Sequence, residues 1–366
     1  MAERQQYSSQ GDAQSATARH STSSHVAADV SNRISLLRYL LIFGVVLVHI
    51  PEVPGLEHPA VFQLIQSFLA DGVSRASVPL LTCISGYLLF ASAIDRRPGQ
   101  LLAAKTRSLL VPMAIWNLAL LVVLYVLQEG DHWTPFFRDY YPFYADRWID
   151  GVFAIDKLPA NTPTYFLRDL YVASMLAPLS GLFLRRLPFL GLALLILIMS
   201  QGWDGQLFVR GDIAVNFYIG GLLATQRHDL GKFDDYAGIL LALFVCACAL
   251  VAYFGLKHNF WFKLLAPWLL WPVSWRMVKS RFGPRLISLS KYSFFFFMSH
   301  YIVLRVLWRL YFEFDADGSH YAYFWFLSPV VAALIAWAAY VSLEKLTPSL
   351  LRLVLGRALS PSPRSG

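Results

Sequence analysis

Charged residues are scarce in this sequence. Only 15% of its 366 residues are Asp, Glu, Lys or Arg, whereas 57% are hydrophobic. A soluble domain of this length needs far more charge to cover its surface, so the composition excludes an ordinary soluble protein. Apolar stretches long enough to cross a hydrocarbon core recur along almost the whole chain. The sequence therefore predicts an all-α fold, a polytopic bundle of transmembrane helices.

Cysteine is scarce too, with three residues in the chain, all within apolar stretches. Cys246 and Cys248 are alternate residues, and alternate side chains on a helix point apart, which argues against a disulfide or a metal pair. The histidines His49 and His300 stand in separate stretches, without a cluster of carboxylates or cysteines beside them. No metal site is therefore expected.

About ten transmembrane spans are expected from the apolar stretches. They make up one membrane domain, residues 33–347. Residues 1–32, rich in Ser, Gln, Ala and Thr, are expected to form a disordered tail, and residues 348–366 a second tail. The expected spans cover residues 34–52, 76–94, 108–128, 164–184, 187–203, 211–226, 236–256, 260–278, 293–312 and 321–343.

Basic residues exceed acidic ones, which gives a net charge of +8. With the N-terminus placed in the cytoplasm, basic residues gather in the inner loops and acidic residues in the outer loops, the positive-inside pattern. The charge thus follows membrane topology, no nucleic-acid partner is expected, and both tails are placed in the cytoplasm. The inner residues include Arg96, Arg97, Lys105, Arg107, Arg185, Arg186, Arg276, Lys279, Arg281, Arg285 and Lys291, and the outer ones Glu129, Asp131, Asp139, Asp146, Asp150, Asp156, Glu313, Asp315 and Asp317.

Arg38 and His49 stand at the two ends of the aliphatic run RYLLIFGVVLVHI in the first expected span. Eleven helical steps return to within about 20° of the starting face and rise about 16 Å, so both side chains would share one stripe. Ionisable groups at membrane depth are costly and mark candidate functional sites. His49 can equally be an interfacial histidine, an explanation that suits His300, inside the aromatic run YSFFFFMSHYIVL, less well.

The second expected span carries Arg75 at its outer edge and Ser85 and Gly86 near its middle. Small residues at such a place permit close contact between helices, or they let a narrow ligand pass between them. Both interpretations of Ser85 and Gly86 stay open.

Further charges stand at the ends of the third and fourth spans. Arg168 and Asp169 are adjacent near an outer end, and since neighbours on a helix diverge by about 100°, we expect no good pairing between them. They are either interfacial charges or the lining of a polar vestibule. At the inner side, Lys105 and Arg107 either set the topology or hold an anionic cofactor that arrives from the cytoplasm.

Several motifs together resemble the acyltransferase-3 family of bacterial membrane acyltransferases. They are Arg38 followed after ten residues by His49, and the segments SRASVPLLTCISGYLLF, KTRSLLVPMAIWN, TYFLRDLYVASMLAPL and LSKYSFFFFMSHYIVL, in the family's order over roughly residues 33–345. One departure is LLTCISG, where the family usually has phenylalanines before its Ser-Gly.

The resemblance implies a bacterial inner-membrane enzyme that moves an acyl group, usually acetyl, from cytoplasmic acyl-CoA to a sugar hydroxyl. The implied acceptor is a lipid-linked or polymeric glycan at the extracytoplasmic face, such as an exopolysaccharide or the O-antigen of lipopolysaccharide. The resemblance also implies that Arg38 and His49 are essential.

A mechanistic hypothesis joins these residues. Arg38 steadies the pantetheine arm or the phosphates of acetyl-CoA, and His49 takes the hydroxyl proton as general base. A covalent route through Ser85 or an acyl-histidine stays open, as do two rivals: a glycan or lipid transporter and an acylase at the cytoplasmic face. The expected roles are catalysis for His49, Arg38 and His300, acyl-CoA binding for Lys105, Arg107, Ser85 and Gly86, and acceptor binding for Arg75, Arg168 and Asp169.

Overall fold

Helices are the only regular secondary structure in the described part of the chain. The computed structural model describes residues 28–52, 58–132, 134, 137–257, 259–315 and 317–357. The α-helices are α1 (described over Ala28–Val48), α2 (Ala60–Ser67), α3 (Ser77–Ala91), α4 (Pro98–Lys105), α5 (Val111–Glu129), α6 (Ala145–Phe153), α7 (Tyr165–Met175), α8 (Ala177–Arg186), α9 (Pro188–Gln201), α10 (Gly211–Thr225), α11 (Ala237–Tyr253), α12 (Phe260–Lys279), α13 (Gly283–Leu289), α14 (Ser293–Phe314), α15 (Tyr321–Leu346) and α16 (Pro348–Val354).

Several of these helices are suited to a membrane. Each of the ten expected spans coincides with a helix, or with a bent pair of helices, while the number of crossings stays a prediction. Five described helical segments are long and apolar enough to cross a membrane on their own. The bent pair α7 and α8 would add a sixth crossing if it forms one span, with a bend of 58°. Pro178 explains this bend, because proline cannot continue the preceding helix without a kink. The five segments that are long and apolar enough on their own are Ala28–Val48, Ala60–Ala91, Pro98–Glu129, Asp234–Tyr253 and Tyr321–Leu346.

Two of the long segments contain a π-helical turn. Phe68–Val73 and the short 3₁₀ turn Ser74–Ala76 join α2 to α3, so that Arg75 lies within a continuous helical segment and not at its start. Thr106–Leu110 joins α4 to α5 in the same way and carries Arg107. Such irregular turns re-aim side chains and are frequent at functional sites.

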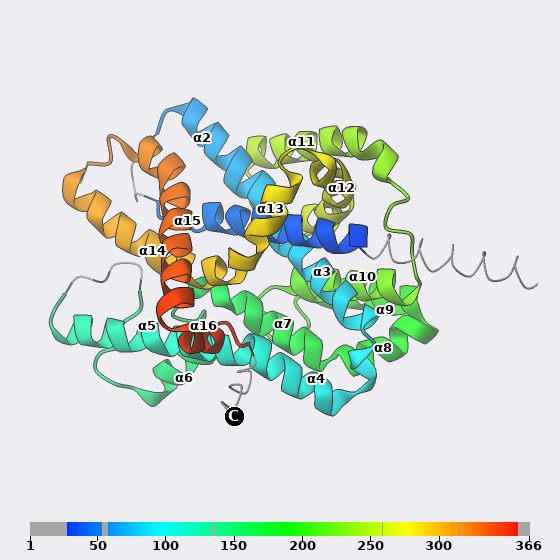
Figure 1. The fold of residues 1–366 in the computed structure, drawn as a ribbon, viewed down its shortest axis with the longest axis horizontal. Coiled ribbons are helices and arrows are strands. Elements are labelled where there is room, and N and C mark those ends of the chain that lie inside the picture. Colours follow the sequence, from blue (N-terminus) through cyan, green and yellow to red (C-terminus); the bar gives the residue numbers. More distant parts are fainter. Residues whose placement is uncertain are drawn as a thin grey trace, which may run out of the picture.

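The helices pack mainly in pairs. α11 packs on α12, α14 on α15, and α10 on α3, while α1, in dark blue, crosses the centre of the view in Figure 1. At the α3–α10 crossing, a Cβ added to Gly86 would lie closer than 3.0 Å to the carbonyl oxygen of Phe217. A Cβ added to Gly220 would overlap the carbonyl oxygen of Cys83 in the same way. Glycine is therefore what lets these two backbones touch.

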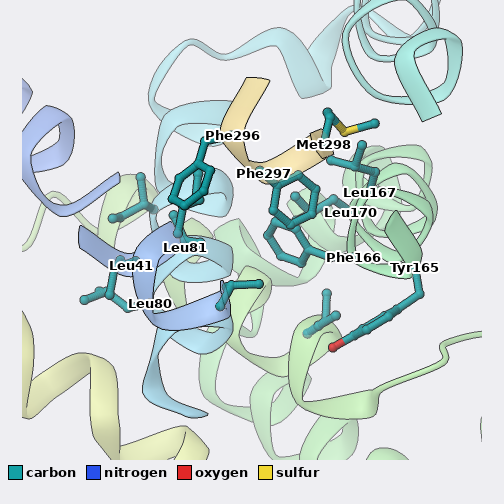
Figure 2. Packing of buried hydrophobic residues seen from close by; sticks show 14 of the residues in the cluster. Leu41, Leu80, Leu81, Tyr165, Phe166, Leu167, Leu170, Phe296, Phe297 and Met298 are labelled. Atoms are coloured by element: carbon teal, nitrogen blue, oxygen red, sulfur yellow. The ribbon is translucent and has the colours of Figure 1, made fainter. Parts of the chain in front are cut away.

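A large apolar core fixes the helices that surround the candidate site. Figure 2 shows side chains from four helices meeting in this core: Leu41 of α1, Leu81 of α3, Phe166 of α7 and Phe297 of α14. The Phe166 and Phe297 rings pack edge to face, with centroids 5.8 Å apart. The core thus holds together elements that are far apart in the sequence.

Both ends of the described chain pack on the bundle. Residues 28–32 are helical, although the sequence places them in a disordered tail, and the buried Arg33 donates two hydrogen bonds of 2.8 Å to Asp234. Residues 348–354, assigned to the second tail, form α16, and the indole of Trp116 donates to the carbonyl of Val354. The division into one membrane domain and two tails stays a prediction.

The segment between α5 and α7 folds around α6. The carboxylate of Asp150 accepts hydrogen bonds from Arg138 at 2.8 Å and from the backbone amides of Asp156 and Lys157. Burial alone would raise the pKa of Asp150, but the hydrogen bonds to Arg138 and the two amides lower it below its usual value. This segment is therefore tied down by a charged contact at its centre.

Candidate active site

His49 directly follows α1, and the helix itself orients its ring. The ring nitrogen Nδ1 lies 2.8 Å from the carbonyl oxygen of Val45, one turn earlier. A carbonyl oxygen can only accept a hydrogen bond, so in the neutral imidazole Nδ1 carries the proton. Nε2 is then left with a free lone pair, which is what a general base requires.

His300 of α14 packs directly against His49. The two ring centroids are 5.5 Å apart at an interplanar angle of 70°, and His300 is fully buried. Its Nδ1 lies 2.7 Å from the carbonyl oxygen of Phe297, and its Nε2 has no hydrogen-bond partner among the described residues. The structure therefore brings together two histidines that the sequence places 251 positions apart.

A cavity of about 430 Å³ opens beside His49. Three helices contribute side chains from their first turns: Tyr165 of α7, Asp212 of α10 and Lys263 of α12. The complete lining is Val45, Val48, His49, Arg75, Val78, Leu158, Tyr165, Val209, Arg210, Asp212 and Lys263.

Hydrogen bonds between side chains and backbone fix the helix ends around this cavity. Asn117 of α5 donates to the hydroxyl of Thr164 and accepts from the amide of Asn161, just before α7. Asn161 in turn donates to the carbonyl of Met298, two residues before His300. These buried bonds connect α5, α7 and α14, so Tyr165 and His300 are held in a fixed relation.

Charged side chains in the cavity wall contact one another. The Arg210 guanidinium lies 3.2 Å from the Asp212 carboxylate and donates to the Tyr165 hydroxyl at 3.0 Å. The Lys263 ammonium lies 3.5 Å from the same carboxylate, and Arg75 lies 3.7 Å from Asp71. The cavity thus combines a potential base with several cations able to stabilise negative charge.

Four of these residues were missed by the sequence analysis, namely Tyr165, Arg210, Asp212 and Lys263. Lys263 falls three residues inside the expected span 260–278, and the criterion that singled out His49, an ionisable group within a span, also applies to it. No comparable signal is given by Tyr165, Arg210 and Asp212, because they stand at span ends, where polar residues are ordinary.

The expectation that Arg168 and Asp169 do not pair is wrong. A terminal nitrogen of Arg168 lies 3.0 Å from the Asp169 carboxylate, because the long arginine side chain can bend back along the helix. The buried Asp169 also accepts hydrogen bonds from the backbone amides of Val209 and Arg210, and Arg168 donates to the carbonyl of Leu207. The pair therefore anchors the segment that carries Arg210, while its role in acceptor binding stays a prediction.

The other predicted site residues lie away from the cavity. Arg38 is exposed on α1, which is helical over the whole interval towards His49, and it has no ion pair among the described residues. Lys105 is half-buried, and Arg107 lines a separate cavity together with Arg357. The Ser85 hydroxyl donates to the carbonyl of Leu81. Their roles in binding acyl-CoA stay predictions.

A second cavity, of about 670 Å³, adjoins the first, and Val48 and Arg75 line both. Its wall also contains Glu52, His58 and Lys257. In the described ranges, no three His, Cys, Asp or Glu side chains come together in a way that could hold a metal ion.

Comparison with known proteins defines the family of this chain. A family model described as an acyltransferase domain matches residues 31–343, so the chain belongs to this acyltransferase family. The chain is also similar to the succinoglycan biosynthesis protein ExoH of Rhizobium meliloti (strain 1021). The two are 30% identical over 300 residues, which cover 78% of this chain and 81% of that protein. No solved structure matches the chain.

Proposed function

We propose that this protein transfers an acyl group, specifically acetyl, from cytoplasmic acyl-CoA to a sugar hydroxyl of an extracytoplasmic glycan. Membership of the acyltransferase family supports the reaction type. The relative's role in succinoglycan biosynthesis supports an exopolysaccharide or similar glycan as the acceptor. We place the enzyme in the bacterial cytoplasmic membrane with both ends of the chain in the cytoplasm, as the loop charges favour.

The observation that carries this proposal is the geometry of His49. Its Nδ1 is fixed on the carbonyl of Val45, so Nε2 is the basic nitrogen, and the residue lines a cavity that also contains three cationic side chains. In the proposed step, Nε2 accepts the proton of the sugar hydroxyl while the hydroxyl oxygen attacks the thioester carbonyl. The C–S bond then breaks, and the CoA thiolate leaves and takes up the proton.

The cavity cations have a separate role in this step. Arg75, Arg210 and Lys263 line the cavity with His49. The tetrahedral intermediate carries a negative oxygen, and cations already fixed in the cavity wall stabilise such charge more than they stabilise the neutral thioester. Arg210, which is held by Asp212 and Tyr165, is the most firmly positioned of the three.

The donor, acyl-CoA, is proposed to reach this cavity from the cytoplasmic side, opposite to the glycan acceptor. Arg38 lies eleven residues before His49, and we assign it to the pantetheine arm or the phosphates of acyl-CoA. Lys105 and Arg107 are assigned to the phosphates at the inner mouth. Arg75 lies just before α3, whose other end, at Ala91, is proposed to face the cytoplasm. Since one α-helical residue rises about 1.5 Å, the 15 residues of α3 place that end about 22 Å from the Arg75 side of the cavity.

Purified protein in liposomes tests the proposal against a transporter. Vesicles contain an oligosaccharide acceptor, and acetyl-CoA labelled in its acetyl group is added outside. Acetyl transfer that is lost in His49→Ala, without net movement of the glycan across the membrane, supports the enzyme. Glycan movement without label transfer would refute it. Mass spectrometry of surface glycans from cells with and without the protein identifies the natural acceptor.

A further inference from the structure

The cavity beside His49 contains more positive than negative charge. Its lining includes Arg75, Arg210 and Lys263 but a single carboxylate, Asp212, which two of these cations share. The remaining cation, Arg75, contacts Asp71 outside the cavity, and Asp71 also pairs with Lys257 at 3.7 Å. In the described part of the chain, four cations therefore share two carboxylates.

Two of the four cations keep donors available for a ligand. Arg75 reaches Asp71 only at 3.7 Å, and its Nε is buried without a hydrogen-bond partner among the described residues. Lys263, with 5% of its surface exposed, has one contact to Asp212 at 3.5 Å. Arg210, by contrast, is held by closer contacts, at 3.2 Å to Asp212 and at 3.0 Å to Tyr165. Buried charges without a close counter-charge are costly, so such an arrangement calls for an anion.

The backbone around the cavity adds to this preference. The helices α7, α10 and α12 each place their first turn in the cavity wall. The N-terminal end of a helix carries a partial positive charge and unpaired amide groups, which favour anions. Only α12 has a side-chain cap here, since Asn259 accepts from the amide of Phe262. The helix dipoles and the cationic side chains thus both favour a negatively charged ligand in the cavity.

We propose that the cavity binds a carboxylate or phosphate of the substrate between Arg75 and Lys263, next to His49. This inference rests on the proposed acyl transfer and adds the substrate class: one of the two reactants carries an anionic group near the reacting atoms. That group belongs either to the acceptor, as a uronic acid or a phosphorylated sugar, or to the acyl group, which would then be a dicarboxylic acyl chain in place of the acetyl group proposed above.

A binding experiment tests the anion site without any turnover. The full-length chain, purified in detergent, is heated in the presence of succinate or glucuronate and, in parallel, of the neutral succinamide or glucose. We expect the two anions to raise Tm in a saturable manner and the neutral compounds to leave it unchanged. In Lys263→Met and in Arg75→Gln the anion effect should vanish. Lys263→Arg should retain it, since the charge is kept.

Lys257→Met serves as the matched control. Lys257 pairs with the same carboxylate as Arg75 but lies outside the His49 cavity and is largely exposed. This variant loses one positive charge, as Lys263→Met does, and should keep the full anion effect. An equal loss of the effect in Lys257→Met and Lys263→Met would mean that net charge alone is responsible, and would overturn the proposed site.

Turnover measurements identify the source of the anionic group. Acetyl-CoA is compared with succinyl-CoA, and a glucose oligosaccharide with one that contains glucuronic acid. We expect at least about a tenfold preference in kcat/KM for the anionic member of one pair, and its loss in Lys263→Met. Acyl transfer with no preference in either pair and no anion effect on Tm would refute this inference alone. An anion effect on Tm without acyl transfer to any acceptor would refute the proposed function and leave the anion site standing.

Discussion

The rings of His49 and His300 meet edge to face, 5.5 Å apart, with each Nδ1 directed at a backbone carbonyl of its own helix. Both neutral rings therefore present an unprotonated Nε2. Only His49 lines the cavity, so the two rings are expected to differ in function. His49 is the proposed base, and we propose that His300 positions it.

Replacing His49 with Ala should reduce acyl transfer at least about a hundredfold, since general bases contribute roughly 10²–10⁴-fold. Abundance in the membrane should stay near normal, because the half-buried ring contributes little to the core. Transfer of labelled acetyl to an acceptor measures the effect. His320→Ala, at an exposed histidine, is the control and should be fully active. Activity above about a tenth of the original would exclude His49 as the base.

Replacing His300 with Phe tests whether its ring positions His49 or only fills space in the core. Phenylalanine fills the same buried space among aromatic rings and removes the unpartnered Nε2, so Tm should change little or rise. Acyl transfer should nevertheless fall about tenfold, with the loss in kcat and not in KM for acyl-CoA, because the His49 ring loses its polar neighbour and packs against a phenyl ring instead. Unchanged kcat in a stable variant would show that His300 is merely a core residue.

Replacing Arg38 with Lys tests what the exposed guanidinium contributes. Lysine keeps the charge but loses the planar fork that grips carbonyls and phosphates with two bonds, so activity should fall at least about tenfold. Arg97→Lys, at another exposed arginine, should be fully active and controls for the exchange itself. Equal activities of the two variants would mean that charge alone matters at position 38.

Replacing Gly86 with Ala should destabilise the protein by about 1–3 kcal/mol, because the added methyl group would overlap the carbonyl of Phe217 and force α3 away from α10. Gly99→Ala is a matched control, since a Cβ there has no neighbour within 4 Å, and helix propensity should make it neutral or slightly stabilising. Thermal unfolding in detergent compares the two variants. Equal Tm values would contradict the close helix contact.

Replacing Asp169 with Ala should lower the free energy of unfolding by at least about 2 kcal/mol, because two backbone amides and Arg168 lose a buried acceptor. Since the segment at 207–210 carries Arg210, acyl transfer should fall as well. Asp204→Ala removes one bond from the same segment, to the amide of Phe208, and should have a much smaller effect on both. Similar effects of the two variants would show that Asp169 is not the anchor.

Much of the fold was predictable because long apolar stretches leave few alternatives to helices. The ten expected ranges coincide with helices, and Arg75 and His49 line one cavity. Contacts between distant charges were not predictable. Arg33 with Asp234 and Asp212 with Lys263 pair across at least 50 residues, and a single sequence does not reveal which helices are neighbours. The Arg168–Asp169 pair was missed because helix geometry describes Cβ directions, not the reach of a long side chain.

The contact between Gly86 and Phe217 also bears on the rigidity of the cavity wall. With α3 and α10 locked backbone to backbone, the two walls that carry Arg75 and Asp212 move as one rigid unit. If the proposed sugar acceptor needs more room than the cavity provides, we expect the start of α12, with Lys263, to move while α3 and α10 stay in place. Such a movement would separate Lys263 from Asp212 and leave its ammonium group free for the anion of the proposed substrate.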